Sequence, residues 1–174
     1  MTDRESALGK IAVGDIFHAT APNGAGLICQ ALRVTDTTIH SRPVTSRDQY
    51  EFDRKTGMAQ HEINGHLIPC TIDSVALLPA DVHEVMLDLG RKNADPSPKE
   101  DSGLNDAECR GLVFAAQYYP ANPIVPPAQP WQMMNVERRL ATGEDSKAYE
   151  SLTKDEKIDL ILINYLIPAN RPQD

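Results

Sequence analysis

The segment HEINGHLIPC, residues 61 to 70, holds the residue types in this chain that most suggest chemistry. Two histidines, a glutamate and a cysteine lie within it, and all of these side chains can bind zinc. A zinc protease needs the spacing HExxH on a helix, because ligands four residues apart lie on one helical face. Here the spacing is HExxxH, and the included Asn64-Gly65 is a strong signal for a two-residue hairpin turn. The sequence therefore predicts a β-hairpin.

That turn fixes three expected cross-strand pairs: Ile63 with His66, His61 with Ile68, and Ala59 with Cys70. His61 and His66 then become diagonal neighbours, which could share a metal with a third ligand from elsewhere in the chain. Cys70 lies four positions along an extended strand from His66, about 13 Å away, so it does not join them easily. Because the other neighbours are apolar, we expect a half-buried strand pair, and a metal site at His61 and His66 is the alternative.

No other stretch carries a complete catalytic or cofactor-binding motif. Residues 22 to 26, PNGAG, are rich in glycine but lack the lysine and the spacing of a phosphate-binding loop. No serine lies in a GxSxG elbow, and no cysteine or serine has a partner in sequence that marks a nucleophile. We therefore assign no catalytic residue, no cofactor-binding residue, no metal ligand and no cofactor, and the sequence favours a protein that is not an enzyme.

Charge and cysteine content restrict the partners and the compartment. The 174 residues carry a net charge of −8, so the long-range field repels nucleic acid and anionic lipid. The three cysteines are widely spaced and include no CxxC pair, which is typical of a reducing compartment. The N-terminus MTDRESALGK is polar, and no apolar run approaches the ~20 residues that span a bilayer. We expect a soluble cytoplasmic protein that binds neither nucleic acid nor membranes.

The first half of the chain has the pattern of a β-meander, because it is rich in Val, Ile and Thr, alternates in places, and is interrupted by turn residues. Six strands are expected, at residues 14–20, 27–34, 38–44, 49–53, 58–63 and 66–78, the last broken near Pro69. Residues 53 to 57 are expected to form a hairpin loop in which Gly57 has a positive φ. The pattern predicts a small antiparallel β-barrel or strongly bent sheet of SH3-like shape.

Two further hairpins give a common register. A turn at Asp36-Thr37 and a loop at residues 45 to 48 fix the expected pairs, which are Val34 with Ile39, Leu32 with Ser41, Arg33 with His40, Ser41 with Phe52, Arg42 with Glu51, and Pro43 with Tyr50. Opposed residues share a face, so both hairpins predict the same inward residues: Ile28, Leu32, Val34, Ile39, Tyr50 and Phe52. The outward face is basic in part, but the expected Arg42–Glu51 pair reduces its charge, which favours a solvated face over an anion site.

The period changes to a helical one at Asp81, where Val82, Val85, Met86 and Leu89 repeat at helical spacing. Asp81 and Glu84 fit a capping pair, and the helix is expected to end near Gly90. Residues 93 to 103 are polar and contain two prolines, which predicts a flexible linker. The sequence thus divides after the first helix.

The part that follows the linker is expected to be helical. Asn105 and Glu108 repeat the capping pattern, and a helix that includes Cys109 as a core residue is expected to end before Pro120. Residues 120 to 130 hold five prolines, so they favour an extended connector, with a ligand for an aromatic groove as the alternative. Trp131 then begins another expected helix.

The last segment, residues 153 to 167, opens with a capping box and continues with apolar residues on more than one helical face. A helix this apolar must be covered, by its own domain or by another subunit. The segment therefore predicts a protein partner or a homo-oligomer, bound through the C-terminal helices.

Together these patterns predict an α+β fold in which an antiparallel SH3-like β-barrel or bent sheet is followed by an α-helical C-terminal region. The expected organisation is a small β-barrel domain with a closing helix at 10–92, a flexible linker at 93–103, and a helical region at 104–168 with a proline-rich connector at 120–130. The function we expect is that of a non-catalytic binding or adaptor protein acting through protein–protein contacts. The alternative is a metal-dependent enzyme or metal-binding protein that uses His61 and His66.

Overall fold

The computed structural model describes residues 3–20, 26–63, 66–95 and 104–124, apart from the side chains of residues 60–63, 66–68 and 120. Its elements, in chain order, are α1 (Asp3–Gly9), β1 (Ile16–Thr20), β2 (Gly26–Val34), β3 (Thr38–Pro43), β4 (Tyr50–Asp53), β5 (Met58–Ile63), β6 (His66–Ser74), α2 (Ala80–Ala94) and α3 (Asp106–Ala121). Most of the glycine-rich stretch at 22–26, of the expected linker and of the expected proline-rich connector lies outside the described residues, as do both helices expected after that connector. None of the described helices is long and apolar enough to cross a membrane.

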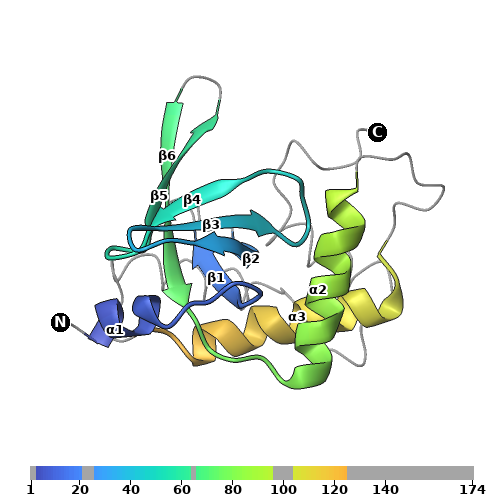
Figure 1. The fold of residues 1–174 in the computed structure, drawn as a ribbon. Helices are drawn as coiled ribbons and strands as arrows, with labels where there is room; N and C mark the ends of the chain where they lie inside the picture. The colour runs from blue at the N-terminus through green and yellow to red at the C-terminus, as the bar shows by residue number, and fades with distance from the viewer. Residues whose placement is uncertain (1–2, 21–25, 64–65, 96–103, 125–174) are drawn as a thin grey trace, which may run out of the picture.

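The six strands form one antiparallel sheet in the order β4-β3-β2-β1-β6-β5. The sheet curls until its edge strands β4 and β5 approach each other, which makes a nearly closed barrel. The β5–β6 hairpin extends beyond the other strands (Figure 1). An α+β fold with a barrel-like antiparallel sheet is therefore confirmed, and each of the six expected strands is present. The expected break near Pro69 is wrong, since Pro69 pairs with Gln60 within a continuous β6 that ends at Ser74.

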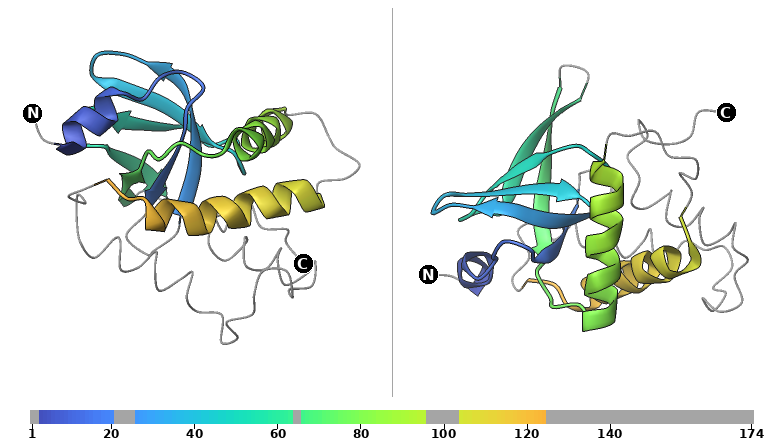
Figure 2. Two further views of the ribbon diagram at one scale, coloured as in Figure 1. Left: turned by 90° about the horizontal axis from the view of Figure 1, so that it is seen from below. Right: turned by 45° about the vertical axis from the view of Figure 1, so that its right-hand side comes forward.

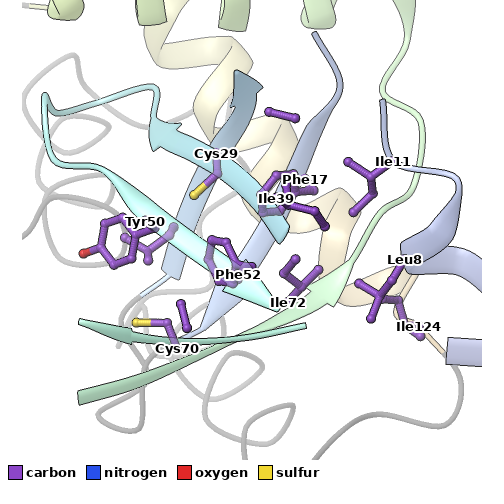
Figure 3. Packing of buried hydrophobic residues seen from close by; sticks show 14 residues of the cluster. Leu8, Ile11, Phe17, Cys29, Ile39, Tyr50, Phe52, Cys70, Ile72 and Ile124 are labelled. Atoms are coloured by element: carbon purple, nitrogen blue, oxygen red, sulfur yellow. The ribbon is translucent and has the colours of Figure 1, made fainter. Parts of the chain in front are cut away.

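The barrel interior is an apolar core built from both halves of the sheet. Figure 3 shows Phe17, Phe52 and Ile72 close together in this core. The rings of Phe17 and Phe52 meet edge to face, with their centroids 5.5 Å apart. The buried members of the core are Leu8, Ile11, Phe17, Ala19, Leu27, Cys29, Ala31, Ile39, Tyr50, Phe52, Ala59, Cys70, Ile72 and Ile124.

Helix α1 was not expected from the sequence, and it packs against the loop between β4 and β5. The guanidinium of Arg4 donates through Nη2 to the carbonyls of Thr56 and Ile72, each at 2.8 Å. Gly57 in that loop has φ of 74°, as predicted, and a Cβ there would lie 2.5 Å from Arg4 Nη2. A glycine at this position therefore allows both the turn and the approach of α1.

A second core lies on the other side of β1 and β2, where α2 and α3 pack against the sheet. Strand β1 is consequently buried on both faces. Gly111 lets the helices approach closely, since a Cβ there would lie 2.7 Å from the end of the Met86 side chain. The buried members are Ile16, Ile28, Val44, Leu78, Met86, Leu89, Cys109, Leu112, Val113, Ala115, Ala116 and Tyr119.

The ends of the two helices agree with the sequence only in part. The capping box of α3 is confirmed, because Asn105 Oδ1 accepts from Glu108 N at 2.8 Å and Asn105 N donates to Glu108 Oε1 at 2.9 Å. The expected cap of α2 at Asp81 is wrong, since the helix begins at Ala80 after Pro79, without a side-chain cap. Helix α2 also continues to Ala94, and α3 includes Pro120 in its last turn.

The register of β2 against β3 departs from the prediction at a bulge. Val34 pairs with Ile39 as expected, but the register shifts between Ala31 and Arg33, so Ser41 pairs with Ala31 and the expected pair with Leu32 is wrong. Two of the expected inward residues are therefore misplaced. Ile28 belongs to the second core, and the partly buried Leu32 belongs to neither.

Strand β4 is offset by two residues from its expected position against β3, because the loop between these strands is longer than predicted. Val44 is buried in the second core, and its N–H donates to Ile28 O at 2.8 Å, so the chain continues along β2 beyond Pro43 before it turns toward β4. Ile39 consequently pairs with Phe52 and Ser41 with Tyr50. An offset of two keeps the same side chains inward, and the interior places of Ile39, Tyr50 and Phe52 are confirmed.

Candidate functional site

The hairpin that contains the two histidines has the backbone register predicted for it. Ile63 pairs with His66, His61 with Ile68 and Ala59 with Cys70, and these pairs were expected from the Asn64-Gly65 turn. The side chains of residues 60 to 63 and 66 to 68 lie outside the described part, so the alternative metal pair stays a prediction. Among the side chains that are described, no group of three His, Cys, Asp or Glu is arranged to hold a metal ion.

All three cysteines are buried in the cores. Cys29 and Cys70 lie in the barrel interior, and Cys109 lies between the helices and the sheet. Burial raises the pKa of Cys70 to about 11, and burial with the nearby Cys70 raises the pKa of Cys29 still further. Because the thiolate is the reactive form, neither barrel thiol is suited to act as a nucleophile near neutral pH.

The outward basic face is partly neutralised, but by a different pair from the one expected. Glu51 lies opposite His40, and His40 Nδ1 is 3.7 Å from Glu51 Oε2, so the expected Arg42–Glu51 pair is wrong. Arg42 Nη2 instead donates to the carbonyl of Gly90 at the end of α2, at 3.4 Å. Arg33 Nη2 lies 2.9 Å from His40 Nε2. This face therefore joins β2, β3, β4 and α2 by polar contacts.

A buried group of polar side chains lies between β1, β6 and α3. Its centre is Asp73, at which the register of β6 against β1 shifts between Ser74 and Ile72. A bulge re-aims the side chains of a strand. Ile72 faces the barrel interior, while Asp73 and Ser74 both make contacts on the helix side of the sheet.

The Asp73 carboxylate is contacted by two side chains of β1. His18 Nδ1 lies 2.6 Å from Asp73 Oδ1, and the Thr20 hydroxyl donates to Asp73 Oδ2. The imidazole of His18 packs on the ring of Tyr119 from α3, with centroids 5.4 Å apart. We call Asp73, His18, Thr20 and Tyr119 the bulge cluster.

Backbone contacts at the same place tie the end of α3 to β6. Ser74 Oγ donates to the carbonyl of Asn122 at 2.6 Å, and Ile124 N donates to the carbonyl of Asp73 at 2.8 Å. Arg4 approaches from the opposite side through its bond to Ile72 O. Burial lowers the pKa of Arg4, and the negative charge of Asp73 opposes that shift. The bulge thus connects the barrel, α1 and the end of α3.

The bulge cluster combines residue types that serve acid–base catalysis, but it is enclosed. His18 is 1% exposed, Thr20 0%, Asp73 6% and Tyr119 1%. Burial raises the pKa of Tyr119 well above its usual value, so its phenol stays protonated. A general acid or base must come within hydrogen-bonding reach of a substrate, which this packing does not offer. The arrangement is suited to holding strands and helix together.

The helices differ sharply in what they present to solvent. The exposed positions of α2 are all charged apart from its first residue, namely Asp81, Glu84, Asp88 and Arg91, which is typical of a solvated face. The exposed positions of α3 after its first residue are Ala107, Arg110, Phe114, Gln117 and Ala121, at helical spacing and with a single charge. We call these five residues, with Tyr118 and Leu77 beside them, the outer face of α3.

Aromatic contacts organise this outer face. The rings of Phe114 and Tyr118 stack with centroids 5.4 Å apart, and the Tyr118 hydroxyl donates to the carbonyl of Leu77 at 3.0 Å. Leu77 is 79% exposed and Phe114 39%. In Figure 2 (left) the strands and α2 lie on one side of α3. Two of the three large apolar side chains that are exposed in the described part, Leu77 and Phe114, therefore lie on this face.

Sequence reasoning found neither the bulge cluster nor the outer face. His18 and Asp73 are 55 positions apart, and no motif connects them. The available signal was a histidine and an aspartate within otherwise apolar strand segments, where a buried polar group needs a partner. For the outer face, the signal was a helix with a wide apolar surface. Comparisons of the chain with protein-family models, curated proteins and solved structures found no match.

Proposed function

We propose that the chain is a non-catalytic binding or adaptor protein that acts through protein–protein contacts. The outer face of α3 is the observation that carries this proposal. Tyrosine and phenylalanine are enriched where proteins bind each other, and charged residues are depleted at the centre of such interfaces. Phe114, Tyr118 and Leu77 supply these side chains, and Arg110 supplies a single positive charge at one end.

The described titratable groups also support the proposal, because they are poorly placed for catalysis. The bulge cluster is enclosed, and the barrel thiols have raised pKa values, so these groups favour a structural part over catalysis. The proposal retains the narrower expectations from the sequence. These are an SH3-like barrel, a protein partner or homo-oligomer bound through the C-terminal helices, no binding of nucleic acid, and a cytoplasmic location.

Site-specific photo-crosslinking tests the proposal. A photoreactive residue at Phe114 of the full chain is expected to give a discrete protein adduct, and the same residue at Glu84 on the charged face of α2 is the matched control. The adduct partner, once identified and purified, should bind the parent chain and should bind Phe114→Ala at least about tenfold more weakly, since a central aromatic anchor carries much of an interface's energy. Equal adducts at both positions, or unchanged affinity in Phe114→Ala, would reject the proposal.

A further inference from the structure

We propose that the outer face of α3 is bound by the chain's own C-terminal segment, residues 153 to 167. This inference rests on the proposed function because it concerns the same face. The segment would cover that face in the free protein, and a protein partner would have to displace it. In a contact of this kind, an amphipathic helix places apolar side chains at helical spacing against an apolar surface. The segment and the face are complementary in apolar character, in charge and in reach.

The sequence of the segment, TKDEKIDLILINYLI, matches the outer face in composition. Its second part is almost wholly apolar and requires a covering surface, and the described part of the chain offers Phe114, Tyr118 and Leu77 as such a surface. Its first part carries the acids Asp155, Glu156 and Asp159 and the bases Lys154 and Lys157, so three negative and two positive charges leave a net charge of −1. A surface that is apolar and carries a single positive charge is opposite in sign to this part of the segment.

Arg110 supplies that positive charge. It is exposed on the outer face, one helical turn from Phe114, and it makes no ion pair with any of the described residues. The exposed face of α2 is a poorer match, since Asp81, Glu84, Asp88 and Arg91 offer nothing apolar and the one positive charge among them is paired with Asp88.

The path of the chain brings the segment within reach. Ile124 is held to β6 by its bond to Asp73 O, so the chain leaves the described part beside the end of α3. Residues 125 to 152 then separate it from the segment. A connection of that length spans about 30 Å even when coiled, whereas α3 is about 24 Å long.

The same tether favours the chain's own segment over that of a second copy. A short connection gives an effective concentration on the order of millimolar. A second copy would have to reach a similar concentration before it occupied the face equally well. At micromolar concentration the protein is therefore expected to be a monomer with the face covered.

Hydrogen exchange measured by mass spectrometry on the purified full chain tests this inference without any partner. Peptides from residues 153 to 167 should be protected in the parent, and Phe114→Asp should raise their exchange rate about tenfold or more, because it places a charge in the apolar contact. Arg110→Glu should raise it up to about fivefold, as expected for an exposed ion pair. Glu84→Gln on α2 is the control and should leave the rate unchanged.

Light scattering on the same samples completes the test. Protection that both outer-face substitutions weaken, at a monomeric mass, supports the inference. An unprotected segment in the parent, protection unchanged by both substitutions, or a doubled mass at micromolar concentration overturns it. Crosslinking tests only whether a protein partner binds the outer face, and hydrogen exchange tests only whether the C-terminal segment covers it. Either proposal can therefore be rejected while the other stands.

Discussion

Replacing Asp73 by alanine tests whether the bulge cluster is a structural tie. The substitution removes the carboxylate that His18 Nδ1 approaches at 2.6 Å and to which the Thr20 hydroxyl donates. Both of those side chains are buried, at 1% and 0% exposure, so water does not readily take the place of the carboxylate. The bond from Ile124 N to the Asp73 carbonyl belongs to the backbone and should survive.

The expected loss follows from this geometry. A buried polar group that loses its hydrogen-bond partner costs about 1–3 kcal/mol, and the substitution leaves two such groups, on His18 and Thr20. Asp73→Ala should therefore lower the free energy of unfolding by about 2–6 kcal/mol, where a whole domain is stable by about 5–15 kcal/mol. Asp73→Asn keeps the shape and part of the hydrogen bonding, so its loss should be smaller, about 1–3 kcal/mol.

Urea unfolding followed by far-ultraviolet circular dichroism measures these losses. Asp81→Ala is the matched control, because Asp81 is an exposed aspartate on α2 and its removal should change stability by less than about 0.5 kcal/mol. The reasoning fails if Asp73→Ala unfolds at the same urea concentration as the parent. A stable variant would mean that the buried carboxylate serves something other than the fold.

Three further outcomes are expected. Gly14→Ala and Gly57→Ala should each lower the free energy of unfolding by about 1–2 kcal/mol, because both glycines have a positive φ. Gly57→Ala should cost at least about 1 kcal/mol more, because only its Cβ meets Arg4 of α1. Thermal or urea unfolding measures both losses, and equal losses would contradict this reasoning. Cys70 has a pKa of about 11, so at pH 8 roughly one thiol in a thousand is ionised, and a thiol reagent should label it slowly when folded, faster as pH rises, and fully in urea. Rapid labelling at pH 8 in the folded state would refute its burial. Metal analysis should find no stoichiometric zinc, because two histidines fall short of the usual four ligands; one equivalent that is lost when His61 and His66 become Ala would instead establish the metal site.

Local signals in the sequence predicted local structure well. The Asn64-Gly65 turn gave the pairing of β5 with β6 residue by residue, and the spacing of Asn105 and Glu108 gave the start of α3. Both depend on residues within a few positions of each other, where turn and capping geometry leave few options. The positive φ of Gly57 belongs to the same class.

The features that sequence reasoning missed depend on distant parts of the chain. The bulge near Leu32 and the continuation of Val44 along β2 accompany the burial of Ile28 and Val44 in the second core, which a strand pattern alone does not encode. The bulge at Asp73 likewise makes sense only once β1 and α3 are beside it. Helix α1 is short, and contacts such as that of Arg4 with Thr56 stabilise it, so its own sequence gave little signal.

Under the proposed function, the two faces of α3 have separate roles, one in stability and one in recognition. Tyr119 points inward to His18, and its neighbour Tyr118 points outward to Phe114, with the two tyrosine rings 6.3 Å apart. The inner face is fixed by the second core and, at its end, by the bulge cluster, so substitutions there should unfold the protein. Tyr118 is partly buried against the second core, but Phe114 and Arg110 are exposed and belong to neither core, so these two residues can be changed in a folded chain. Loss of binding without loss of stability is therefore the result that would distinguish a recognition surface from an incidental apolar patch.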